Sequence, residues 1–420
     1  MPSVFACNIK NESTFRPSAM KIIILTGEPF PNGMAAVNRI KCFARAFRQG
    51  GVDCEVLVYR RTEVYGKPPH NTDGNGVCEG IPYRYIGGSP LRGSNVFVRK
   101  FNDCLDILHT VRYLEGNLSA GDLLFLNVQD SAALTLLFIR AAHRKGAKCI
   151  LELCELPYGT GKETGYAKWM RAYTLRRQFP LLDGVVSISD ALLEYAKAHT
   201  RPSCKHVKVP IMVDFDKYNL EDGSADAEFP YIFHAGTLYE QKDGILGMIE
   251  AFGMAVGELP ETVRFVLAGR VEDSPHCVEI ERLIEKYELH DRIRFTGYLF
   301  GEQLRKYLGG ASLVILNKYR TQQNYYGFST KLGEYLAAGK PIILTDVGEA
   351  MHWVKDGETA MVTPAEDVKA LSGGIVKVFS DLPRARQIGA AGKELCRRSF
   401  DYRKWSAPLA DFVKSVVICK

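Results

Sequence analysis

A run of apolar residues long enough to cross a membrane is missing from this chain of 420 residues. A spanning helix needs about 18 or more such residues, and the most apolar stretch, LLFLNVQDSAALTLLFI, is interrupted by Asn127, Gln129 and Asp130. The first residues, MPSVFACNIKNESTFRPSA, lack the charged start and apolar centre of a secretory signal. We therefore expect no spanning helix, and we interpret residues 1–19 as a disordered extension before a natural start at Met20.

Cysteine pairs with regular spacing are also missing. The 11 cysteines are scattered, their number is odd, and none forms a C-x-x-C pair, so neither a disulfide framework nor a zinc site is indicated. Such cysteines are typical of reduced proteins, and we expect a cytoplasmic protein in which they are small core residues. No cluster of His, Cys, Asp or Glu has ligand spacing, which predicts no metal and no cofactor.

The motifs of several enzyme classes are missing as well. Neither G-x-G-x-x-G nor G-x-x-x-x-G-K-S/T follows the first apolar run of either half, which argues against dinucleotide-binding and P-loop proteins. No G-x-S-x-G occurs, which argues against an α/β-hydrolase. A glycoside hydrolase would need two carboxylates flanking the scissile bond, and the sequence identifies no such pair.

What the chain does contain is an ordinary globular composition, with 46% hydrophobic and 24% charged residues. Its length favours two domains of about 150 to 200 residues. The net charge is +7 over residues 1–200 and −1 over residues 201–420. The basic half fits an anionic membrane or a phosphate-bearing substrate, and it fits ordinary variation in surface charge equally well.

Short apolar runs alternate with helical patterns along the chain. The clearest runs are KIIILTG, CEVLVYR, DLLFLNV, KCILELC, GVVSIS, YIFHAGTL, RFVLAGR, LVILN and PIILT. Runs without polar alternation are typical of parallel strands that crossover helices cover on both faces. We predict an α/β protein of two doubly wound domains, residues 20–210 and 211–400, with a final helix in residues 401–420. Ligands should bind between them, at the carboxyl ends of the strands.

The second half offers a candidate anion site in HAGTLYEQKDG. A strand ends near Thr237, and a helix is expected to begin after Asp243, which is a good N-cap residue. The ammonium of Lys242 would then reach an anion held over the positive end of that helix. The alternative is a solvated lysine beside a capped helix.

A second candidate lies in STKLGEYLAAG, where Ser329 or Thr330 can cap a helix that Gly339 ends. Lys331 and Glu334 are three residues apart, so they lie on one face of this helix. Helix amides and Lys331 could bind phosphate oxygens, and the carboxylate of Glu334 could accept hydrogen bonds from ribose hydroxyls. The alternative is an exposed ion pair worth about 0.2–0.5 kcal/mol.

In the first half, EPFPNGMAAVNRI follows the first strand. Gly33 would let the backbone approach a ligand closely, and Asn32, Gly33 and Met34 could present amides at a helix start. The alternative is an ordinary turn before a helix.

A further segment of the first half, YAKWMRAYTLRRQF, combines Trp169 and Tyr173 with Arg171, Arg176 and Arg177. Such a helix can lie on an anionic bilayer and reach a lipid-linked sugar. It can also pack its aromatic side chains on its own domain, as amphipathic helices of globular proteins do.

Together these motifs resemble the retaining, nucleotide-sugar-dependent glycosyltransferases of family 4, of the type that builds bacterial surface polysaccharides. The resemblance covers the chain from Met20 to about Pro364 and is carried, in the family's order, by PFPNGMAAVNRI, VVSISDALLEY, VPIMVD, HAGTLYEQKDG, FVLAGRVED, FTGYLFGEQLRKYLGGASLVIL and FSTKLGEYLAAGKPIILTDVG. It implies the GT-B fold, two facing Rossmann-like domains whose last helix crosses back onto the first domain.

The resemblance also implies an activity and its partners. A hexose-type sugar would pass from a UDP- or GDP-sugar to a glycan or polyprenyl-diphosphate-linked acceptor, with retention of configuration and without an obligatory metal ion. The protein would be cytoplasmic, with a possible peripheral contact at the inner face of the cytoplasmic membrane, and would have no nucleic-acid partner.

Site residues follow from the resemblance, position by position. Lys242 would bridge the donor diphosphate, Glu334 would bind the ribose, and Gly33 would lie near the phosphates. The base would lie against the backbone of Tyr298 and Leu299. The acceptor would lie on the first domain, where the candidates are Asn32, Arg39 and Glu155.

Three positions depart from the family pattern. Tyr326 stands in place of a glutamate, Thr237 in place of a phosphate-binding arginine, and Glu155 where a histidine is frequent. Lys331 and Arg270 are the candidates for the missing positive charge.

These departures leave two other functions open. A sugar-nucleotide 2-epimerase would need acid/base residues in the cleft, for which Glu155, Asp130 and His234 are weak candidates. A non-catalytic nucleotide-sugar binder would need none.

Overall fold

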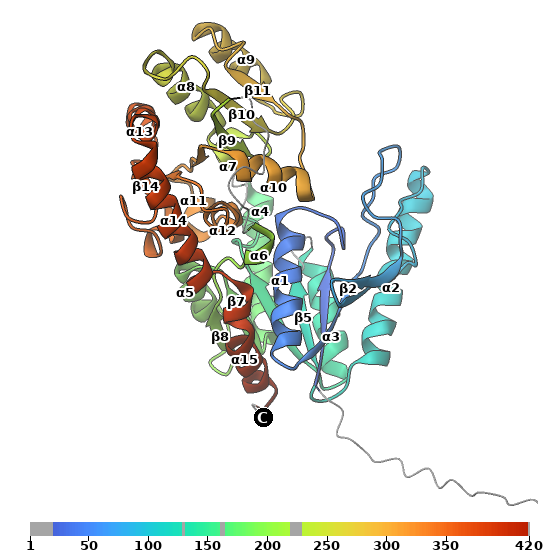
Figure 1. Ribbon diagram of the computed structural model, residues 1–420. Coiled ribbons are helices and arrows are strands. Elements are labelled where there is room, and N and C mark those ends of the chain that lie inside the picture. Colours follow the sequence, from blue (N-terminus) through green and yellow to red (C-terminus); the bar gives the residue numbers. More distant parts are fainter. Residues whose placement is uncertain (1–19, 128–130, 160–163, 219–228, 419–420) are drawn as a thin grey trace, which may run out of the picture.

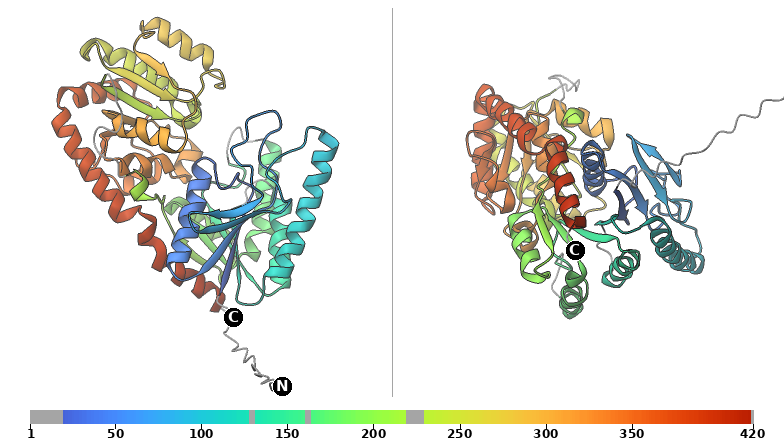
Figure 2. Two further views of the ribbon diagram at one scale, coloured as in Figure 1. Left: turned by 45° about the vertical axis from the view of Figure 1, so that its right-hand side comes forward. Right: turned by 90° about the horizontal axis from the view of Figure 1, so that it is seen from below.

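The computed structural model describes residues 20–127, 131–159, 164–218 and 229–418. The predicted extension, residues 1–19, and the candidate acid/base residue Asp130 lie outside these ranges. Two α/β units face each other, and the last helices run along both of them (Figures 1 and 2). Within the described ranges, no helix has both the length and the hydropathy that crossing a bilayer requires.

The first unit is built on an eight-stranded sheet with the order β3-β4-β2-β1-β5-β6-β7-β8. Its strands are β1 (Lys21–Thr26), β2 (Asp53–Val58), β3 (Asn75–Cys78), β4 (Ile81–Tyr85), β5 (Leu123–Asn127), β6 (Lys148–Leu153), β7 (Gly184–Ser187) and β8 (Lys205–Lys208). All neighbours pair in parallel except β3 and β4, which are antiparallel. The two edge strands, β3 and β8, were not predicted, because their alternating or polar sequences lack the apolar run of a buried strand.

Helices cover both faces of this sheet. They are α1 (Ala35–Gln49), α2 (Val96–Asn117), α3 (Ala132–Arg144), α4 (Gly165–Arg177), the 3-10 turn η1 (Phe179–Leu181) and α5 (Asp190–His199). Apolar side chains of α1 share one core with α15 (Ser406–Ile418), and those of α2, α3 and α5 pack in another. The final helix of the chain therefore lies on the first unit, where Ser406 Oγ is 3.2 Å from Gln49 Oε1.

The second unit is built on a six-stranded parallel sheet with the order β11-β10-β9-β12-β13-β14. Its strands are β9 (Tyr231–Ala235), β10 (Arg264–Ala268), β11 (Ile293–Phe295), β12 (Leu313–Leu316), β13 (Ile342–Thr345) and β14 (Met361–Thr363). Its helices are α7 (Glu240–Asp243), α8 (Ile245–Ala255), η2 (Val256–Glu258), α9 (Cys277–Lys286), α10 (Gly301–Gly310), α11 (Gln322–Tyr326), α12 (Thr330–Ala337), η3 (Gly348–His352), α13 (Val368–Ser380) and α14 (Leu382–Ser399). The predicted fold class, two doubly wound parallel-sheet domains, is confirmed.

Helix α13 was not predicted, because Gly373 and Gly374 interrupt its sequence and lower its intrinsic helix propensity. A Cβ atom at residue 374 would lie 3.4 Å from side chains of Ile343 and Thr363. This is an ordinary van der Waals distance, so α13 packs on β13 and β14 without depending on the glycine.

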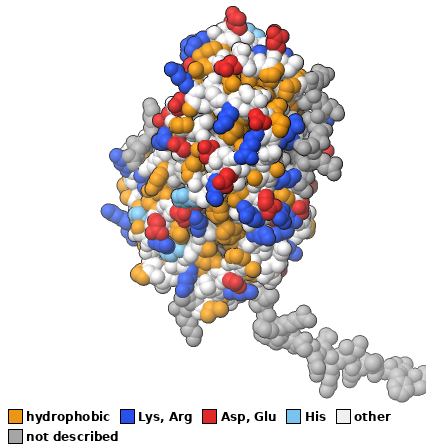
Figure 3. All heavy atoms as spheres, turned by 60° about the vertical axis from the view of Figure 1, so that its left-hand side comes forward, with side chains coloured by type: hydrophobic (Ala, Val, Ile, Leu, Met, Phe, Trp, Pro, Cys, Tyr) orange, Lys and Arg blue, Asp and Glu red, His pale blue; other side chains and the backbone are white. Residues whose placement is uncertain are grey.

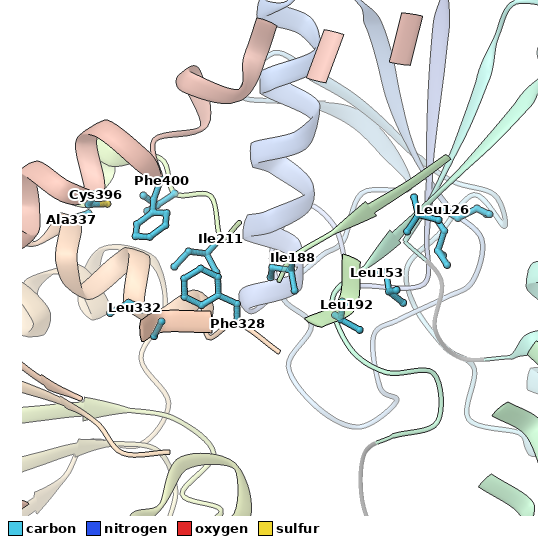
Figure 4. Packing of buried hydrophobic residues seen from close by; sticks show 14 of the residues in the cluster. Leu126, Leu153, Ile188, Leu192, Ile211, Phe328, Leu332, Ala337, Cys396 and Phe400 are labelled. Carbon is cyan, nitrogen blue, oxygen red and sulfur yellow. The ribbon is translucent and has the colours of Figure 1, made fainter. Parts of the chain in front are cut away.

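The two units share one apolar core. Phe328 and Ile211 lie between Phe400 on one side and Ile188 of the first unit on the other (Figure 4). The rings of Phe328 and Phe400 have centroids 5.8 Å apart in an edge-to-face arrangement. The connections that cross the junction are the segment after β8, which includes α6 (Phe215–Tyr218), and the 3-10 turn η4 (Tyr402–Trp405).

Arg39 of α1 is buried beneath this junction, with 3% of its surface exposed. Its guanidinium pairs with the buried carboxylate of Glu152 and donates to the carbonyl oxygens of Pro210 (2.8 Å) and Val209 (3.2 Å). The expectation that Arg39 faces an acceptor is therefore wrong, because every donor nitrogen already has a partner inside the protein.

Removal of this guanidinium should destabilise the fold. Arg39→Met leaves the carboxylate of Glu152 buried without its cation, which typically costs about 3–5 kcal/mol, and urea unfolding would measure the loss. Arg48→Met on the same helix is the matched control, because the Arg48–Asp53 pair is solvent-exposed and should contribute less than about 1 kcal/mol. Equal losses for the two variants would contradict the prediction.

Candidate functional site

The candidate site lies where β9 and β12 end, on the side of the second sheet that faces the first unit. The loop after β9 begins with Gly236, where an added Cβ atom would lie 2.5 Å from Asp243 Oδ2 and 2.7 Å from Lys331 Nζ. These distances are too short for real contacts, so the glycine leaves the space in which the carboxylate and the ammonium meet.

Asp243 is the buried centre of this site, with 1% of its surface exposed. Its Oδ2 accepts hydrogen bonds from the amide (3.0 Å) and hydroxyl (3.1 Å) of Thr237, and its Oδ1 pairs with Lys331 Nζ. The prediction that Asp243 caps the following helix is wrong: the residue ends α7, and Gly244, at φ 64°, precedes α8. The carboxylate turns back toward Thr237 because cationic and N–H partners lie on that side.

Two lysines pair with this carboxylate, and a third, Lys242, precedes it in the chain. Lys331 contacts it directly, and Lys318 Nζ lies 3.6 Å from the same oxygen and donates to the carbonyl of Lys242. The side chain of Lys331 is 22% exposed and that of Lys318 is 14% exposed, whereas Lys242 is open to solvent. The structure therefore places Lys331 on the carboxylate and adds Lys318, which no sequence motif indicated. Lys242 lies near enough to lower the pKa of Lys318.

Burial and charge shift the acidities in this cluster. Burial raises the pKa of Asp243, but Lys331 and the other nearby cations outweigh it and hold that pKa well below its usual range. Burial, followed by repulsion from Lys331, lowers the pKa of Lys318 to about 8. The carboxylate thus stays ionised, while Lys318 loses its proton more readily than an ordinary lysine.

His234 of β9 lies beneath the cluster and is fully buried. Its Nδ1 is 2.9 Å from the carbonyl oxygen of Ile315, and its Nε2 is 4.0 Å from Asp243 Oδ1. Burial, together with repulsion from Lys331, lowers the pKa of His234 to about 4. The ring is therefore neutral at pH 7, and its burial removes it from direct contact with a substrate in the cleft.

Glu334 points in a different direction from Lys331. Its Oε1 accepts a hydrogen bond from Asn38 Nδ2 of α1 (3.2 Å), and the hydroxyl of Tyr218 in α6 also bonds it. Burial raises the pKa of this carboxyl group. Glu334 therefore joins the two units at the floor of the site, a contact between distant segments that sequence spacing could not reveal.

The start of α12 differs in detail from the prediction. Ser329 occupies the N-cap position, but its hydroxyl makes no capping hydrogen bond, and Thr330 is the first helical residue. No described side chain caps this helix start. The amide of Leu332 donates to the carbonyl of Ser329 (3.1 Å), so the amides of Thr330 and Lys331 are left for another acceptor.

A second group of predicted residues lies beyond β10 and β11. The guanidinium of Arg270 lies over the ring of Tyr298, 5.9 Å from its centroid, and Tyr298 also bonds Asp273. Leu299 packs against the shared core. The structure thus groups Arg270 with the residues expected beside a base.

The first unit contributes Gly33 and Asn32 to the loop after β1. A Cβ atom at residue 33 would lie 2.4 Å from Val37 Cγ2, so a larger residue would displace the start of α1. The side chain of Asn32 donates to the carbonyl of His70 (3.0 Å), which ties this loop to residues 59–74. The ring of His70 in turn lies 5.1 Å from that of Phe300 in the second unit.

Glu155 follows β6, and its Oε1 lies 3.5 Å from Gln323 Nε2 of α11. The two units therefore also approach each other here, at the position where the family often has a histidine. Tyr326, in place of the family's glutamate, packs its ring 5.9 Å from Tyr195 of α5. Its carbonyl accepts a hydrogen bond from Ser189 Oγ. The tyrosine is thus part of the contact between the two units.

Two groups of ligand-type residues come together in the described ranges: His143, Cys149 and Asp183, and Asp190, Glu349 and His352. Cations already balance the carboxylates in both groups. Asp183 pairs with Lys148 and Arg201, and Lys208 pairs with the two carboxylates of the second group. These groups therefore have the character of ion-pair networks.

Two facing parallel-sheet domains, with charged groups at the carboxyl ends of the strands between them, define the GT-B class. Solved structures agree over nearly the whole chain. Sucrose-phosphate synthase from Thermosynechococcus elongatus has a TM-score of 0.71 at 16% identity and covers 93% of this chain and 98% of its own. Anabaena Alr3699/HepE, solved in complex with UDP, has a TM-score of 0.67 at 15% identity and covers 93% and 99%. At such identities the likeness shows the fold.

The particular family is indicated by the second unit. Residues 229–381 match the family described as Glycosyl transferases group 1, so the resemblance inferred from the motifs is confirmed there. Alpha-1,3/1,6-mannosyltransferase ALG2 of Dictyostelium discoideum is 24% identical over 42% of this chain and 44% of its own length. Alpha-D-kanosaminyltransferase of Streptomyces kanamyceticus is 24% identical over 41% and 40%. The chain thus spans less than half of the length of these relatives.

The buried His234 predicts a pH effect on stability. Since folding lowers its pKa from near 6.5 to about 4, the unfolded chain takes up this proton more readily, and stability present above pH 6.5 is lost as the pH falls toward 4. The loss should be on the order of 2–3 kcal/mol.

Urea unfolding of wild type and His234→Asn across this pH range would check the effect. The asparagine amide can donate to Ile315 but does not titrate, so the variant should lose less stability. His290→Asn is the control, because His290 is exposed. If His234→Asn lost as much stability between pH 6.5 and pH 4 as the wild type, the pH effect would not come from His234.

Proposed function

We propose that this protein is a retaining glycosyltransferase that moves a hexose-type sugar from a UDP- or GDP-sugar to a glycan or polyprenyl-diphosphate-linked acceptor in surface polysaccharide biosynthesis. The observation that carries the proposal is the convergence of Lys242, Lys318 and Lys331 at the carboxyl ends of β9 and β12. The complex of HepE with UDP supports a uridine donor. A Mycobacterium tuberculosis relative described as GDP-mannose-dependent, 25% identical over 34% of this chain and 38% of its own length, supports a guanosine donor.

In this proposal the donor lies between the two units. Lys242, Lys331 and the first amides of α12 bind the diphosphate, and the backbone near Gly33 approaches it from the first unit. Glu334 binds the ribose hydroxyls in exchange for its contact with Asn38, and the base lies against Tyr298 and Leu299.

Lys331 takes over the role of the missing arginine. Its ammonium meets the carboxylate that also binds the amide and hydroxyl of Thr237, so its charge lies beside the residue that replaces the arginine. Arg270, the second candidate for the missing charge, lies over the ring of Tyr298 instead.

The chemistry follows from these positions. The bond between the anomeric carbon and the diphosphate oxygen breaks, the acceptor oxygen bonds to the same face of that carbon, and the acceptor proton passes to the departing diphosphate. Negative charge grows on the diphosphate as it leaves, and fixed ammonium groups stabilise that charge. A lost contact of this kind typically costs about 3 kcal/mol, roughly a hundredfold in rate. Lysines and helix amides supply this stabilisation without requiring a metal ion.

We also propose a peripheral contact with the inner face of the cytoplasmic membrane. Phe97 of α2 is 84% exposed and Trp169 of α4 is 62% exposed, and Phe101 and Tyr166 beside them are exposed as well. Both helices begin where parallel strands of the first sheet end, so their first turns lie at one edge of the domain. Neighbouring cations, such as Lys100, suit anionic lipid. In contrast, positive and negative side chains intermingle on the face shown in Figure 3.

The donor site predicts the behaviour of Lys331→Met. Wild type should gain thermal stability with UDP or GDP and should release that nucleotide from the matching sugar donor. The variant should bind the nucleotide about tenfold more weakly and turn over roughly a hundredfold more slowly, because an ammonium on the leaving diphosphate is lost.

Calorimetry and a nucleotide-release assay would measure both quantities. Lys377→Met is the matched control, because Lys377 is an exposed lysine in the last turn of α13. A wild type that neither binds nor releases a nucleotide would refute the proposal. Conversion of the donor to its C2 epimer, without transfer, would favour the epimerase.

The membrane contact predicts that the double variant Phe97→Glu/Trp169→Glu binds vesicles that contain phosphatidylglycerol more weakly, because it places two carboxylates in the apolar contact. The fraction of protein that sediments with the vesicles would measure this. Val278→Glu on α9 is the control, because Val278 is equally exposed but lies on the other unit. Unchanged sedimentation of the double variant would contradict the contact.

A further inference from the structure

Asp243 is an unexpected residue beside a site for an anion, because a carboxylate repels a diphosphate. Its oxygen atoms are, however, fully engaged inside the protein. Oδ2 accepts from the amide and hydroxyl of Thr237, and Oδ1 receives Lys331 directly and Lys318 at 3.6 Å. Since the residue is 1% exposed, the carboxylate lies behind the ammonium groups and not at the surface that a ligand would meet.

The charges of the cluster do not balance. Lys242, Lys318 and Lys331 carry three positive charges, and the carboxylate that pairs with two of them is Asp243. In the described part of the chain Lys242 makes no ion pair, and His234 is neutral because its pKa is about 4. Positive charge therefore exceeds the charge of Asp243 around this carboxylate, as binding of the diphosphate of a nucleoside-diphosphate sugar requires.

The geometry also removes freedom from the two lysines. A lysine side chain is flexible, and fixing it costs side-chain entropy. Asp243 is held by Thr237 and by the buried end of α7, so the lysines that pair with it are fixed before a ligand arrives. Each ammonium has three protons. Those that are not donated to Asp243 or, in Lys318, to the carbonyl of Lys242 remain for phosphate oxygens.

We propose that Asp243 is a positioning residue that holds Lys331 and Lys318 as one double cation for the donor diphosphate, in place of the guanidinium that residue 237 lacks. This inference rests on the proposed function. It assigns roles to Asp243 and Lys318, and the acidic residue acts only through the lysines.

A pH signature separates this role from a merely structural one. Asp243 raises the pKa of Lys318, while burial, Lys331 and Lys242 lower it. Without Asp243, Lys318 should lose its proton at a lower pH, so diphosphate binding should weaken earlier as the pH rises above 7. The charged or titratable groups around Lys318 are His234 on β9, Lys242 and Asp243 on α7, and Lys331 on α12.

The test is calorimetric binding of UDP, GDP, uridine and guanosine to the full-length protein between pH 7 and pH 9. Asp243→Asn should weaken binding of the preferred nucleoside diphosphate about tenfold and leave binding of the nucleoside unchanged. It should also shift the loss of diphosphate affinity at alkaline pH to a lower pH. Lys318→Met should weaken diphosphate binding by a similar factor and abolish the loss of affinity at alkaline pH. In a Lys331→Met background, Asp243→Asn should have a smaller further effect at pH 7 than in the wild type, because one of the two groups it positions is gone.

The outcomes separate the inference from the function. If the wild type binds a diphosphate and Asp243→Asn binds it with unchanged affinity and pH dependence, the inference alone is overturned. Full additivity of Asp243→Asn and Lys331→Met would overturn it too. If the wild type binds neither diphosphate, both the inference and the donor site are wrong. If Asp243→Asn does not fold, two other variants replace it in the test. They are the double variant Asp243→Asn/Lys331→Met, which preserves the net charge of the protein, and Lys318→Met.

Discussion

The packing of α12 against both units is the constraint on which the candidate site depends. Leu332 and Leu336 of this short helix are buried in the shared core, and Gly333 lies against Ile211 and Val213 of the connection between the units. This packing leaves Lys331 directed toward α7 and Glu334 directed toward α1. One helix orientation therefore fixes the cationic part and the acidic part of the site together, and any shift of the two units would move Glu334 away from Asn38 before it disturbed Lys331.

The cationic part follows a second constraint, the cost of burying charge. A buried ammonium such as that of Lys318 keeps its charge only when a counter-charge lies nearby. Asp243 supplies this counter-charge from a buried position, behind the lysines. Gly236 belongs to the same arrangement, because a side chain there would occupy the space of the pair. The loop after β9 is thus shaped by electrostatics, and Thr237 contributes its amide and hydroxyl to the carboxylate instead of a charge to the ligand.

The sequence predicted the fold well because buried parallel strands have continuous apolar runs, as in Ile22 to Leu25 of β1. It failed at the edge strands β3 and β8, whose sequences are more polar. Within the site, it identified Lys331 and Glu334 from their spacing on one helix, but not their partners. Asp243 fits a helix cap by residue type, and Arg39 fits a surface cation. Only contacts between distant segments, with Lys331 for the first and Glu152 for the second, show otherwise.

The departures from the family pattern acquire a common explanation in this setting. At residue 237 the lost guanidinium is offset by a lysine that reaches the same place from α12, so the charge is kept while its origin changes. At residue 326 the tyrosine serves the fold without a replacement for the carboxylate, because its ring lies against Tyr195 and joins the two units. The cleft then has Glu155 and Gln323 approaching from opposite sides. Under the proposed function, recognition of the diphosphate is thereby preserved in charge, whereas the groups available to a sugar differ from the family's. The pattern then favours a change in sugar or acceptor.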